Sequence, residues 1–426
     1  MHHGNSAQDR HRGFALRPLT GARARKAAIG VVGFAVAGVM LAACSSGSDN
    51  ASGGSGGSGS QSAPTTTQGP PVNIAVTPAA ADASAMNPST PVVVKASNGT
   101  LKNVTVTNTK TGTVVTGDYS SDKTTWTSNE DLGFGATYSV DATGANPQGS
   151  PNEQKSTLTT INPSLKSYTN MFPAPASVSG SGIGVGMPII FQFSHAVTNK
   201  QAAEAGIKIA TTPSQPVGFY WISSTELDAR PQNYWTAGTK IHVVAKLYGV
   251  DLGGGNFDQQ DRDETYTVHD AWVAKADGNS EQMNIYDNGN LVKTMSISMG
   301  KDSTPTSLGT HVITAKNQSV QMNSCTYGVC PPDPRAYNET EYWAERITNG
   351  GEFVHENPDT VGSQGHSNVS HGCINLNEAD AEWFFNHLGV GDVVEVTNSG
   401  GPQISSGAFI GDWSVPWSQF APVASS

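Results

Sequence analysis

The sequence has few charged residues and few cysteines. Charged side chains make up only 14% of the 426 residues, and 24 Lys and Arg stand against 35 Asp and Glu. Because phosphate binding needs clustered basic side chains, the net charge of −11 argues against nucleic acid as a partner. The four cysteines are few enough to be assigned one by one. With 47 glycines and 24 prolines, the composition is typical of an exported, β-rich protein with many turns.

The one long apolar run of the sequence lies near the N-terminus. Six basic side chains precede it, the run covers residues 27–40, and Leu41-Ala42-Ala43 then leads to Cys44. A basic region, a short apolar core and a small-residue exit describe a secretory signal peptide, and the run is short for a membrane-spanning helix. Cys44 after Leu-Ala-Ala resembles the lipobox of bacterial lipoproteins. We therefore expect residues 1–43 to be a lipoprotein signal peptide and Cys44 to be lipidated. An uncleaved anchor and a plain signal peptide are the alternatives.

This leader predicts an exported protein, lipid-anchored to the outer face of the plasma membrane in the cell envelope. Residues 44–71 are rich in Ser, Gly, Thr and Pro and hold almost no apolar residues. Such a segment cannot bury a core, so we expect a flexible tether that lifts the folded part off the membrane.

Two modules of short strands follow the tether. β-branched runs between turn residues such as Asn98-Gly99 predict a β-sandwich over residues 72–163, and runs such as Ile189-Ile190-Phe191-Gln192-Phe193 predict a second one over residues 164–269. The acidic segment from Asp258 to Glu264 does not have the spacing of a known calcium loop, so we interpret it as a solvated turn.

The third region, residues 270–397, carries a hairpin signal and a helix signal. Asn288-Gly289 between two strand-like runs predicts a tight turn. Residues 378–388 have helical spacing, with the apolar residues at 381, 384, 385 and 388 expected at the core. Residues 398–426 hold the large aromatics Trp413, Trp417 and Phe420, which predict an extension that packs back onto the folded part.

The stretch Ser370-His371-Gly372-Cys373-Ile374-Asn375, with His355 upstream, combines the groups that a thiolate nucleophile needs. A thiolate attacks a carbonyl, and a nearby imidazole takes up the thiol proton or favours the charged form. Gly372 allows a tight turn whose N–H groups could face a developing oxyanion. If a helix begins shortly after Cys373, its dipole could help hold the negative charge.

The motif resembles the signature of the L,D-transpeptidase (YkuD-type) catalytic domain. His355, fourteen further residues, and then Ser-His-Gly-Cys-x-Asn reproduce that signature. The segments from Met322 to Tyr337 and from Phe353 to Trp383, and the tail with Asp412-Trp413 and Pro416-Trp417, resemble the mycobacterial members. The resemblance implies a mainly β fold, in which two immunoglobulin-like β-sandwich modules precede a β-rich catalytic domain with a short helix and a C-terminal extension.

The resemblance also implies a reaction. Cys373 would attack the carbonyl of the third residue in a tetrapeptide stem of peptidoglycan, D-Ala would leave, and an amine on a second stem would resolve the thioester to a 3→3 cross-link. His355 would be the general base, His371 would shape the site, and the N–H groups of Gly372 and Cys373 would form the oxyanion hole. The positions that match substrate-binding residues of the family are Met322, Tyr337, Ser370 and Asn375.

The partners implied are the donor and acceptor stem peptides, the membrane through the lipid anchor, and carbapenems, whose β-lactam carbonyl mimics the scissile bond. No metal or organic cofactor is implied. An L,D-carboxypeptidase that trims tetrapeptides, with water as the acceptor, and a non-catalytic lipoprotein that binds the wall remain alternatives.

Two further features leave choices open. Cys325 and Cys330 could form a local disulfide, since exported proteins keep such bonds; a zinc site lacks close histidines, and two free thiols are the third reading.

Glu356 follows His355 where related mycobacterial enzymes carry serine. The resemblance implies that its backbone carbonyl orients His355. Its carboxylate would raise the pKa of that histidine. We expect an altered pH–rate profile, which Glu356→Ser would test.

Overall fold

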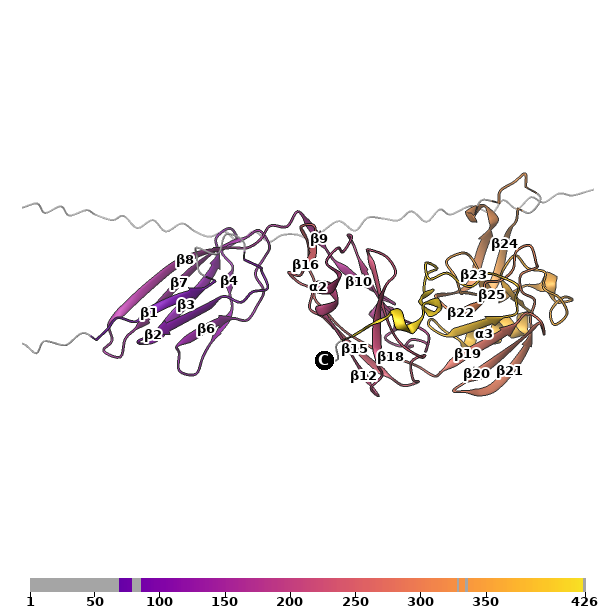
Figure 1. Ribbon diagram of the computed structural model, residues 1–426, viewed down its shortest axis with the longest axis horizontal. Coiled ribbons are helices and arrows are strands. Elements are labelled where there is room, and N and C mark those ends of the chain that lie inside the picture. Colours follow the sequence, from indigo (N-terminus) through magenta and orange to yellow (C-terminus); the bar gives the residue numbers. More distant parts are fainter. Residues whose placement is uncertain (1–68, 79–85, 328, 334–335, 424–426) are drawn as a thin grey trace, which may run out of the picture. The chain divides into compact units, whose positions relative to one another are not determined.

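The computed structural model describes residues 69–78, 86–327, 329–333 and 336–423 (Figure 1). These residues form mainly β-strands, which confirms the predicted fold class. The predicted signal peptide, Cys44 and the tether up to residue 68 lie outside the described residues. Within the described ranges, no helix has the length and apolar character needed to cross a membrane.

The first module is a sandwich of two four-stranded sheets. In β7, buried residues alternate with half-buried ones, as a strand with one core-facing side requires. Tyr138, Val140 and Ala142 of β7 are buried against Leu101 and Trp126. One sheet has the order β1 (Asn73–Thr77), β2 (Val93–Ser97), β6 (Thr125–Ser128), β5 (Gly117–Tyr119), and the other β4 (Val114–Val115), β3 (Thr100–Asn108), β7 (Thr137–Ala145), β8 (Pro151–Thr159).

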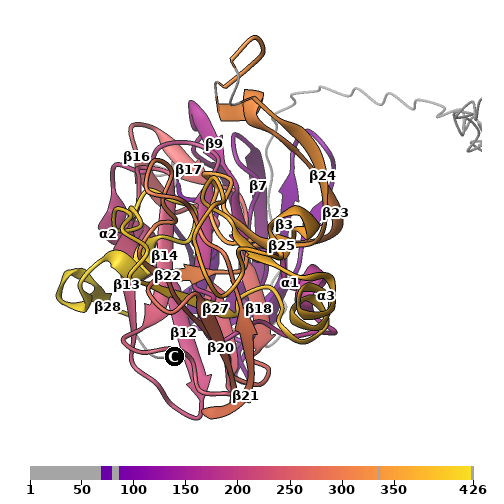
Figure 2. The same ribbon diagram turned by 90° about the vertical axis from the view of Figure 1, so that its right-hand side faces the viewer.

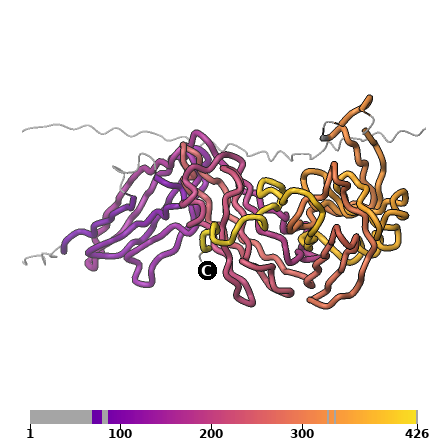
Figure 3. The backbone as a smooth tube through the Cα atoms, turned by 45° about the vertical axis from the view of Figure 1, so that its right-hand side comes forward, coloured from indigo at the N-terminus to yellow at the C-terminus, as the bar shows by residue number. Residues whose placement is uncertain are grey.

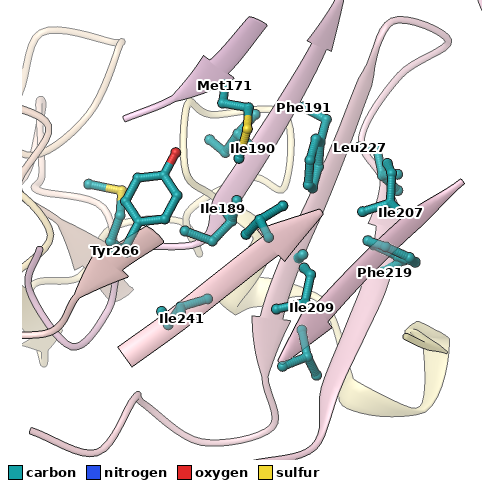
Figure 4. Close-up of a cluster of buried hydrophobic side chains, with 14 of the residues drawn as sticks. Met171, Ile189, Ile190, Phe191, Ile207, Ile209, Phe219, Leu227, Ile241 and Tyr266 are labelled. Carbon is teal, nitrogen blue, oxygen red and sulfur yellow. The ribbon is translucent and has the colours of Figure 1, made fainter. Parts of the chain in front are cut away.

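The second module has a larger core, in which side chains from two facing sheets meet (Figure 4). Phe191 and Leu227 of one sheet and Ile207, Ile241 and Tyr266 of the other are fully or almost fully buried. The sheets are β10 (Thr169–Phe172), β11 (Ile189–Phe193), β14 (Glu226–Pro231), β13 (Val217–Trp221), β28 (Ala421–Pro422); β12 (Ile207–Thr212), β15 (Lys240–Ala245), β18 (Arg262–Thr267); and β16 (Asp251–Gly253), β17 (Asn256–Asp258), β9 (Leu165–Ser167). The helices are α1 (Pro175–Val178) and α2 (Lys200–Ala205).

The third region contains two mixed sheets and one ten-residue helix. The first sheet has the order β21 (Asn290–Ser296), β20 (Gln282–Asp287), β19 (Trp272–Asp277), β27 (Val393–Thr397), β22 (Gly309–Val312). The second has the order β23 (Ala315–Asn323), β24 (Asn338–Arg346), β25 (Phe353–Glu356), β26 (Ile374–Leu376). The remaining helices are α3 (Glu378–His387) and the 3₁₀ turns η2 (Ser324–Tyr327), η3 (Pro358–Thr360), η4 (Asp412–Ser414) and η5 (Trp417–Gln419).

The hairpin and the helix of this region have the local causes that the sequence indicated. Asn288 and Gly289 adopt φ values of 48° and 83°, the left-handed pair that a two-residue hairpin turn requires. Asn377 caps α3 by accepting the Asp380 N–H at 3.0 Å. Ala381, Phe384 and Leu388 are buried, whereas Phe385 is only half-buried beneath the Lys316 ammonium.

The C-terminal extension returns to the second module (Figure 3). β28 pairs with β13 in antiparallel fashion, so it becomes the edge strand of that module's five-stranded sheet. Arg230 of β14 lies 3.1 Å from Asp412 Oδ2 and donates to the carbonyls of Asp412 and Val415. The Arg230 guanidinium also lies over the rings of Trp413 and Phe420. The third region and the second module thus share one core, to which Val312 and Val393 of the third region contribute.

Two expectations need correction. Asp258 is fully buried and accepts a hydrogen bond from Thr169 Oγ1 at 2.6 Å, so the acidic segment is anchored at its start instead of being a solvated turn throughout. Strand β26 separates Cys373 from α3. Because the field of a helix terminus falls off within about one turn, the dipole of α3 does not reach the thiol.

Candidate active site

Two adjacent parallel strands bring the cysteine and the histidine of the motif together. β25 and β26 pair in parallel, with Val354 opposite Ile374 and His355 opposite Asn375. Cys373 directly precedes β26, so its side chain and that of His355 line the same pocket, where Cys373 contributes to the raised pKa of the histidine. Both are buried, with His355 3% and Cys373 9% exposed. The fourteen-residue spacing therefore spans the crossover between two paired strands.

The turn before Cys373 is held by side chains on both sides. Gly372 has a φ of 128°, in a region that L residues rarely adopt, and Thr306 Oγ1 donates to its carbonyl at 2.9 Å. Ser370 Oγ donates to the Cys373 carbonyl at 2.7 Å and accepts the Gly372 N–H at 3.0 Å. The expected role of the Gly372 N–H as a free oxyanion donor therefore needs correction, because Ser370 occupies this N–H.

His355 has a carbonyl and a carboxylate at one ring nitrogen. Nδ1–H donates to the Glu356 carbonyl at 2.6 Å, and Glu341 Oε2 lies 3.3 Å from the same nitrogen. Nε2 is therefore the nitrogen left for Cys373. Burial alone would lower the pKa of His355, but the hydrogen bonds and charges of Cys373 and Glu341 outweigh it and raise the pKa to about 10.

The carboxylate that contacts His355 is thus Glu341 and not Glu356. Since successive side chains of a strand point to opposite faces, His355 lines the pocket of Cys373, whereas Glu356 lines a separate depression with Tyr342, Trp343 and Glu378. The predicted influence of the Glu356 carboxylate on His355 is therefore smaller than that of Glu341, and its contact with the histidine is made by the backbone.

A pocket of about 240 Å³ opens onto Cys373 and His355. Its wall contains three carboxylates, on Glu339, Glu341 and Asp359. The pocket is lined by Met322, Tyr337, Glu339, Glu341, His355, Asn357, Asp359, Thr360, Val369, Ser370, His371, Cys373 and Asn375. All eight catalytic and substrate-binding residues expected from the motif lie here or, for Gly372, in the adjacent turn.

A second depression lies on the other side of Met322 and Tyr337, which line both. It contains Arg346 and Gly351, and the Gly351 carbonyl is 3.7 Å from Cys373 Sγ. Cys373 is therefore close to both depressions, one of which carries carboxylates and the other a guanidinium.

The remaining predicted residues differ in what they contact. Met322, on β23, packs against Phe353 and Cys373. The Tyr337 and His371 rings lie 5.3 Å apart, and His371 Nε2 is 3.3 Å from Lys301 Nζ. Partial burial and the Lys301 charge lower the pKa of His371.

Asn375 is almost fully buried, and its amide has two different environments. Nδ2 donates to Thr360 Oγ1 at 3.2 Å, and within the described part of the chain Oδ1 has no hydrogen-bond partner. A buried acceptor without a donor is unfavourable, so Asn375 Oδ1 keeps an unused hydrogen-bonding capacity at the wall of this pocket.

The strands β23 and β24 run side by side as a hairpin (Figure 2), and a disulfide lies in the segment that joins them. The disulfide joins Cys325 and Cys330, whose Cα atoms are 4.6 Å apart. Cys373 is the free cysteine of the described residues, and Cys44 lies outside them. In the described ranges, no group of three or more His, Cys, Asp or Glu could hold a metal ion.

The motif did not indicate Glu341 or Thr306. Glu339, Glu341 and Glu345 recur at even spacing on β24, and such spacing would place all three on one face. Trp343, however, adopts a φ of 49°, and both Trp343 and Gln318 are absent from the pairing of β23 with β24, whose register is the same before and after them. The alternation is interrupted at this point: Glu341 lies beside His355, whereas Glu345 pairs with Lys316 at 3.3 Å.

Comparison with known proteins identifies the domains. Residues 271–396 match the L,D-transpeptidase catalytic domain family (YkuD), and residues 83–251 match a bacterial Ig domain family (Big_10). The chain is 37% identical to L,D-transpeptidase 2 of Mycobacterium tuberculosis over 330 residues, which cover 78% of this chain and 79% of that protein. It is 31% identical to L,D-transpeptidase 5 of the same organism over 338 residues, which cover 78% and 72%. A solved structure of an L,D-transpeptidase in complex with imipenem is 33% identical and covers 54% of this chain and 97% of that chain, with a TM-score of 0.47.

These matches define the protein as an enzyme in which immunoglobulin-like modules precede an L,D-transpeptidase catalytic domain along the chain. The similarity to L,D-transpeptidases 2 and 5 extends through the modules and the catalytic domain together. The chain belongs to the L,D-transpeptidase family, which confirms the resemblance seen in its motif.

Proposed function

We propose that this enzyme forms 3→3 cross-links in peptidoglycan through a thioester on Cys373. The observation that supports this most directly is the buried pair of Cys373 and His355 in a pocket, with the pKa of His355 raised to about 10. At neutral pH such a histidine is an imidazolium, and a neighbouring imidazolium favours the thiolate form of a cysteine. The imidazolium therefore stands beside the nucleophile before the substrate arrives.

The protons balance around His355. The Cys373 thiolate attacks the carbonyl of the third residue of a tetrapeptide donor, and the amide bond to D-Ala breaks as the His355 imidazolium gives its proton to the departing amine. This leaves a thioester and a neutral imidazole. The side-chain amine of a diamino acid on the acceptor stem then attacks the thioester, His355 accepts a proton from it, and the Cys373 thiolate is released.

The walls of the pocket suit these substrates. The carboxylates of Glu339, Glu341 and Asp359 attract the cationic amine of an acceptor stem. Asn375 Oδ1 can accept an N–H of a stem peptide, and Met322 supplies apolar surface. The Gly372 N–H already donates to Ser370 Oγ, so we assign the hydrogen bond that stabilises the oxyanion to the N–H of Cys373. Removal of one such donor typically slows the reaction ~100–1,000-fold.

We also propose that the chain is exported and anchored by a lipid on Cys44, with residues 44–71 as a tether. The basic, apolar and small-residue order of the leader supports this. In this arrangement the two sandwich modules act as spacers that set how far the active site reaches into the wall. Radiolabelled fatty acid incorporation into the wild type, but not into Cys44→Ala, would test the anchor.

The acyl-enzyme is the first step to measure. The purified protein is incubated with a carbapenem beside Cys373→Ala, and the intact masses are compared. We expect one adduct on the wild type and none on the variant, because the β-lactam carbonyl takes the place of the scissile carbonyl. A folded wild type without an adduct would contradict an activated Cys373.

Stem peptides then separate the alternatives. A tetrapeptide donor with an acceptor that carries a free side-chain amine should give a cross-linked dimer and D-Ala. Release of D-Ala with only a tripeptide product would identify a carboxypeptidase. Retention on peptidoglycan without either product would identify a binding protein.

A further inference from the structure

Glu341 is a buried carboxylate whose ion pair among the described residues is made with His355. Its side chain is 10% exposed, and its Oε2 lies 3.3 Å from His355 Nδ1. A buried carboxylate is unfavourable unless a cation or a donor compensates it. Here the compensating group is the histidine that faces Cys373 with its other nitrogen. The arrangement is that of a nucleophile, a base and an acid in series.

We propose that Glu341 is the positioning residue of a Cys373–His355–Glu341 triad, in which its carboxylate holds His355 with Nδ1 protonated and Nε2 directed at Cys373. This inference rests on the proposed roles of Cys373 and His355 and adds a third member to them. The Glu356 carbonyl orients the same Nδ1–H but carries no net charge. The carbonyl can therefore fix the ring, whereas the Glu341 carboxylate also stabilises the imidazolium through a full charge.

The irregular backbone at Trp343, which adopts a φ of 49°, lies between Glu341 and Glu345. Strict alternation would place Glu341 and Glu345 on one face, but Ala344 is the residue that clusters with Cys373 and Phe353. Glu345 is instead fully buried against Lys316. One carboxylate therefore lies beside the histidine and the other beside a lysine.

Other ionisable groups around His355 must be distinguished from Glu341. Glu356 is its neighbour on β25, and its carboxylate lies with Glu378 of α3 in the separate depression. The groups that share the pocket are Cys373, Glu339, Asp359 and His371. The side chains that raise the pKa of His355 are Cys373 and Glu341, and Glu341 is the carboxylate in contact with its ring. A charge effect from the general acidity of the region would also respond to Glu356, which makes that residue the proper comparison.

The test measures the pH dependence of carbapenem acylation for the full chain and for Glu341→Gln, Glu341→Asp and Glu356→Gln. Glu341→Gln keeps the shape and removes the charge, so the pKa of His355 falls and the imidazolium is lost at lower pH. We expect the alkaline limb of the rate profile to shift to lower pH by about one unit or more. Glu341→Asp should restore part of the shift, and Glu356→Gln should shift the limb much less.

Each outcome has a separate meaning. An unchanged alkaline limb in a Glu341→Gln variant that melts like the wild type would overturn the triad, as would an equal shift in Glu356→Gln. Absence of acylation in the wild type would instead contradict the proposed function itself. If the Gln variant does not fold, ¹⁵N-histidine NMR of the unmodified chain gives the readout. An imidazolium at His355 at pH 8 is expected, and a neutral ring would refute the proposal.

Discussion

Replacing Gly372 by alanine should separate the geometry of the nucleophile turn from its chemistry. The φ of Gly372 is 128°, where a residue with a Cβ is strained by about 1–3 kcal/mol. Space is not the obstacle, because the nearest atom to an added Cβ is Glu352 Cγ at 3.7 Å, an ordinary contact distance. The whole effect of Gly372→Ala therefore comes from the backbone.

The turn can respond in two ways, which have similar energies. It can keep its conformation and accept the strain, or it can relax and lose the hydrogen bonds from Thr306 to the Gly372 carbonyl and from the Gly372 N–H to Ser370. Each of these bonds stabilises the turn by about 1 kcal/mol. A relaxed turn moves Cys373, and a displacement of about 1 Å costs ~100-fold in rate. We expect a free energy of unfolding lower by about 1–3 kcal/mol and acylation slower by ~100-fold.

The assay is carbapenem acylation followed by intact mass, together with thermal unfolding of the same samples. Gly362→Ala is the matched control, since Gly362 has no positive φ and no atom within 4 Å of an added Cβ. It lies in the same crossover between His355 and Ser370. If Gly372→Ala acylates and unfolds like Gly362→Ala, the strained turn does not position the nucleophile, and the reasoning is wrong.

Three further predictions concern the support of the site and of the fold. Thr306→Val removes the hydroxyl that donates to the Gly372 carbonyl. It should slow acylation by ~10-fold, which corresponds to about 1.4 kcal/mol. An acylation rate within twofold of the wild-type rate would contradict this prediction. Burial raises the pKa of Glu345 to about 8, so its protonated form stabilises the fold at low pH and this stabilisation is lost as the pH rises through 8. Glu345→Gln should therefore flatten the melting temperature between pH 5 and 9, and an unaltered slope would disprove the assignment. Arg230→Met leaves the buried Asp412 carboxylate without its cation and should lower the free energy of unfolding, measured with denaturant, by about 3–5 kcal/mol. The double variant Arg230→Met with Asp412→Leu should recover most of this free energy of unfolding.

The sequence indicated much of the fold because its local signals were strong. The Asn288-Gly289 turn and the apolar spacing of α3 have local causes that tertiary packing did not override. The spacing between His355 and Cys373 was recognised through the family signature, and in the structure it spans the crossover between two parallel strands.

The parts of the site that sequence reasoning missed depend on contacts between distant segments. Nothing around Gly372 shows that Ser370 would take its N–H, because the alternative was a free donor at the same turn. Glu341 was hidden because the positive φ of Trp343 interrupts the alternation of side chains along β24, and a tryptophan at positive φ has no distinctive sequence signal.

The return of the C-terminal extension to the second module also affects the order of folding. β28 completes a sheet whose strand β13 precedes the entire catalytic domain, and Arg230 and Val415, which are hydrogen-bonded, are 185 positions apart. During synthesis, one edge of β13 therefore remains unpaired until the catalytic domain and β28 have been synthesised. An unpaired strand edge can pair with the strands of other chains. The sheet of the second module can therefore be completed only after the catalytic domain has been synthesised, although most of its strands precede that domain.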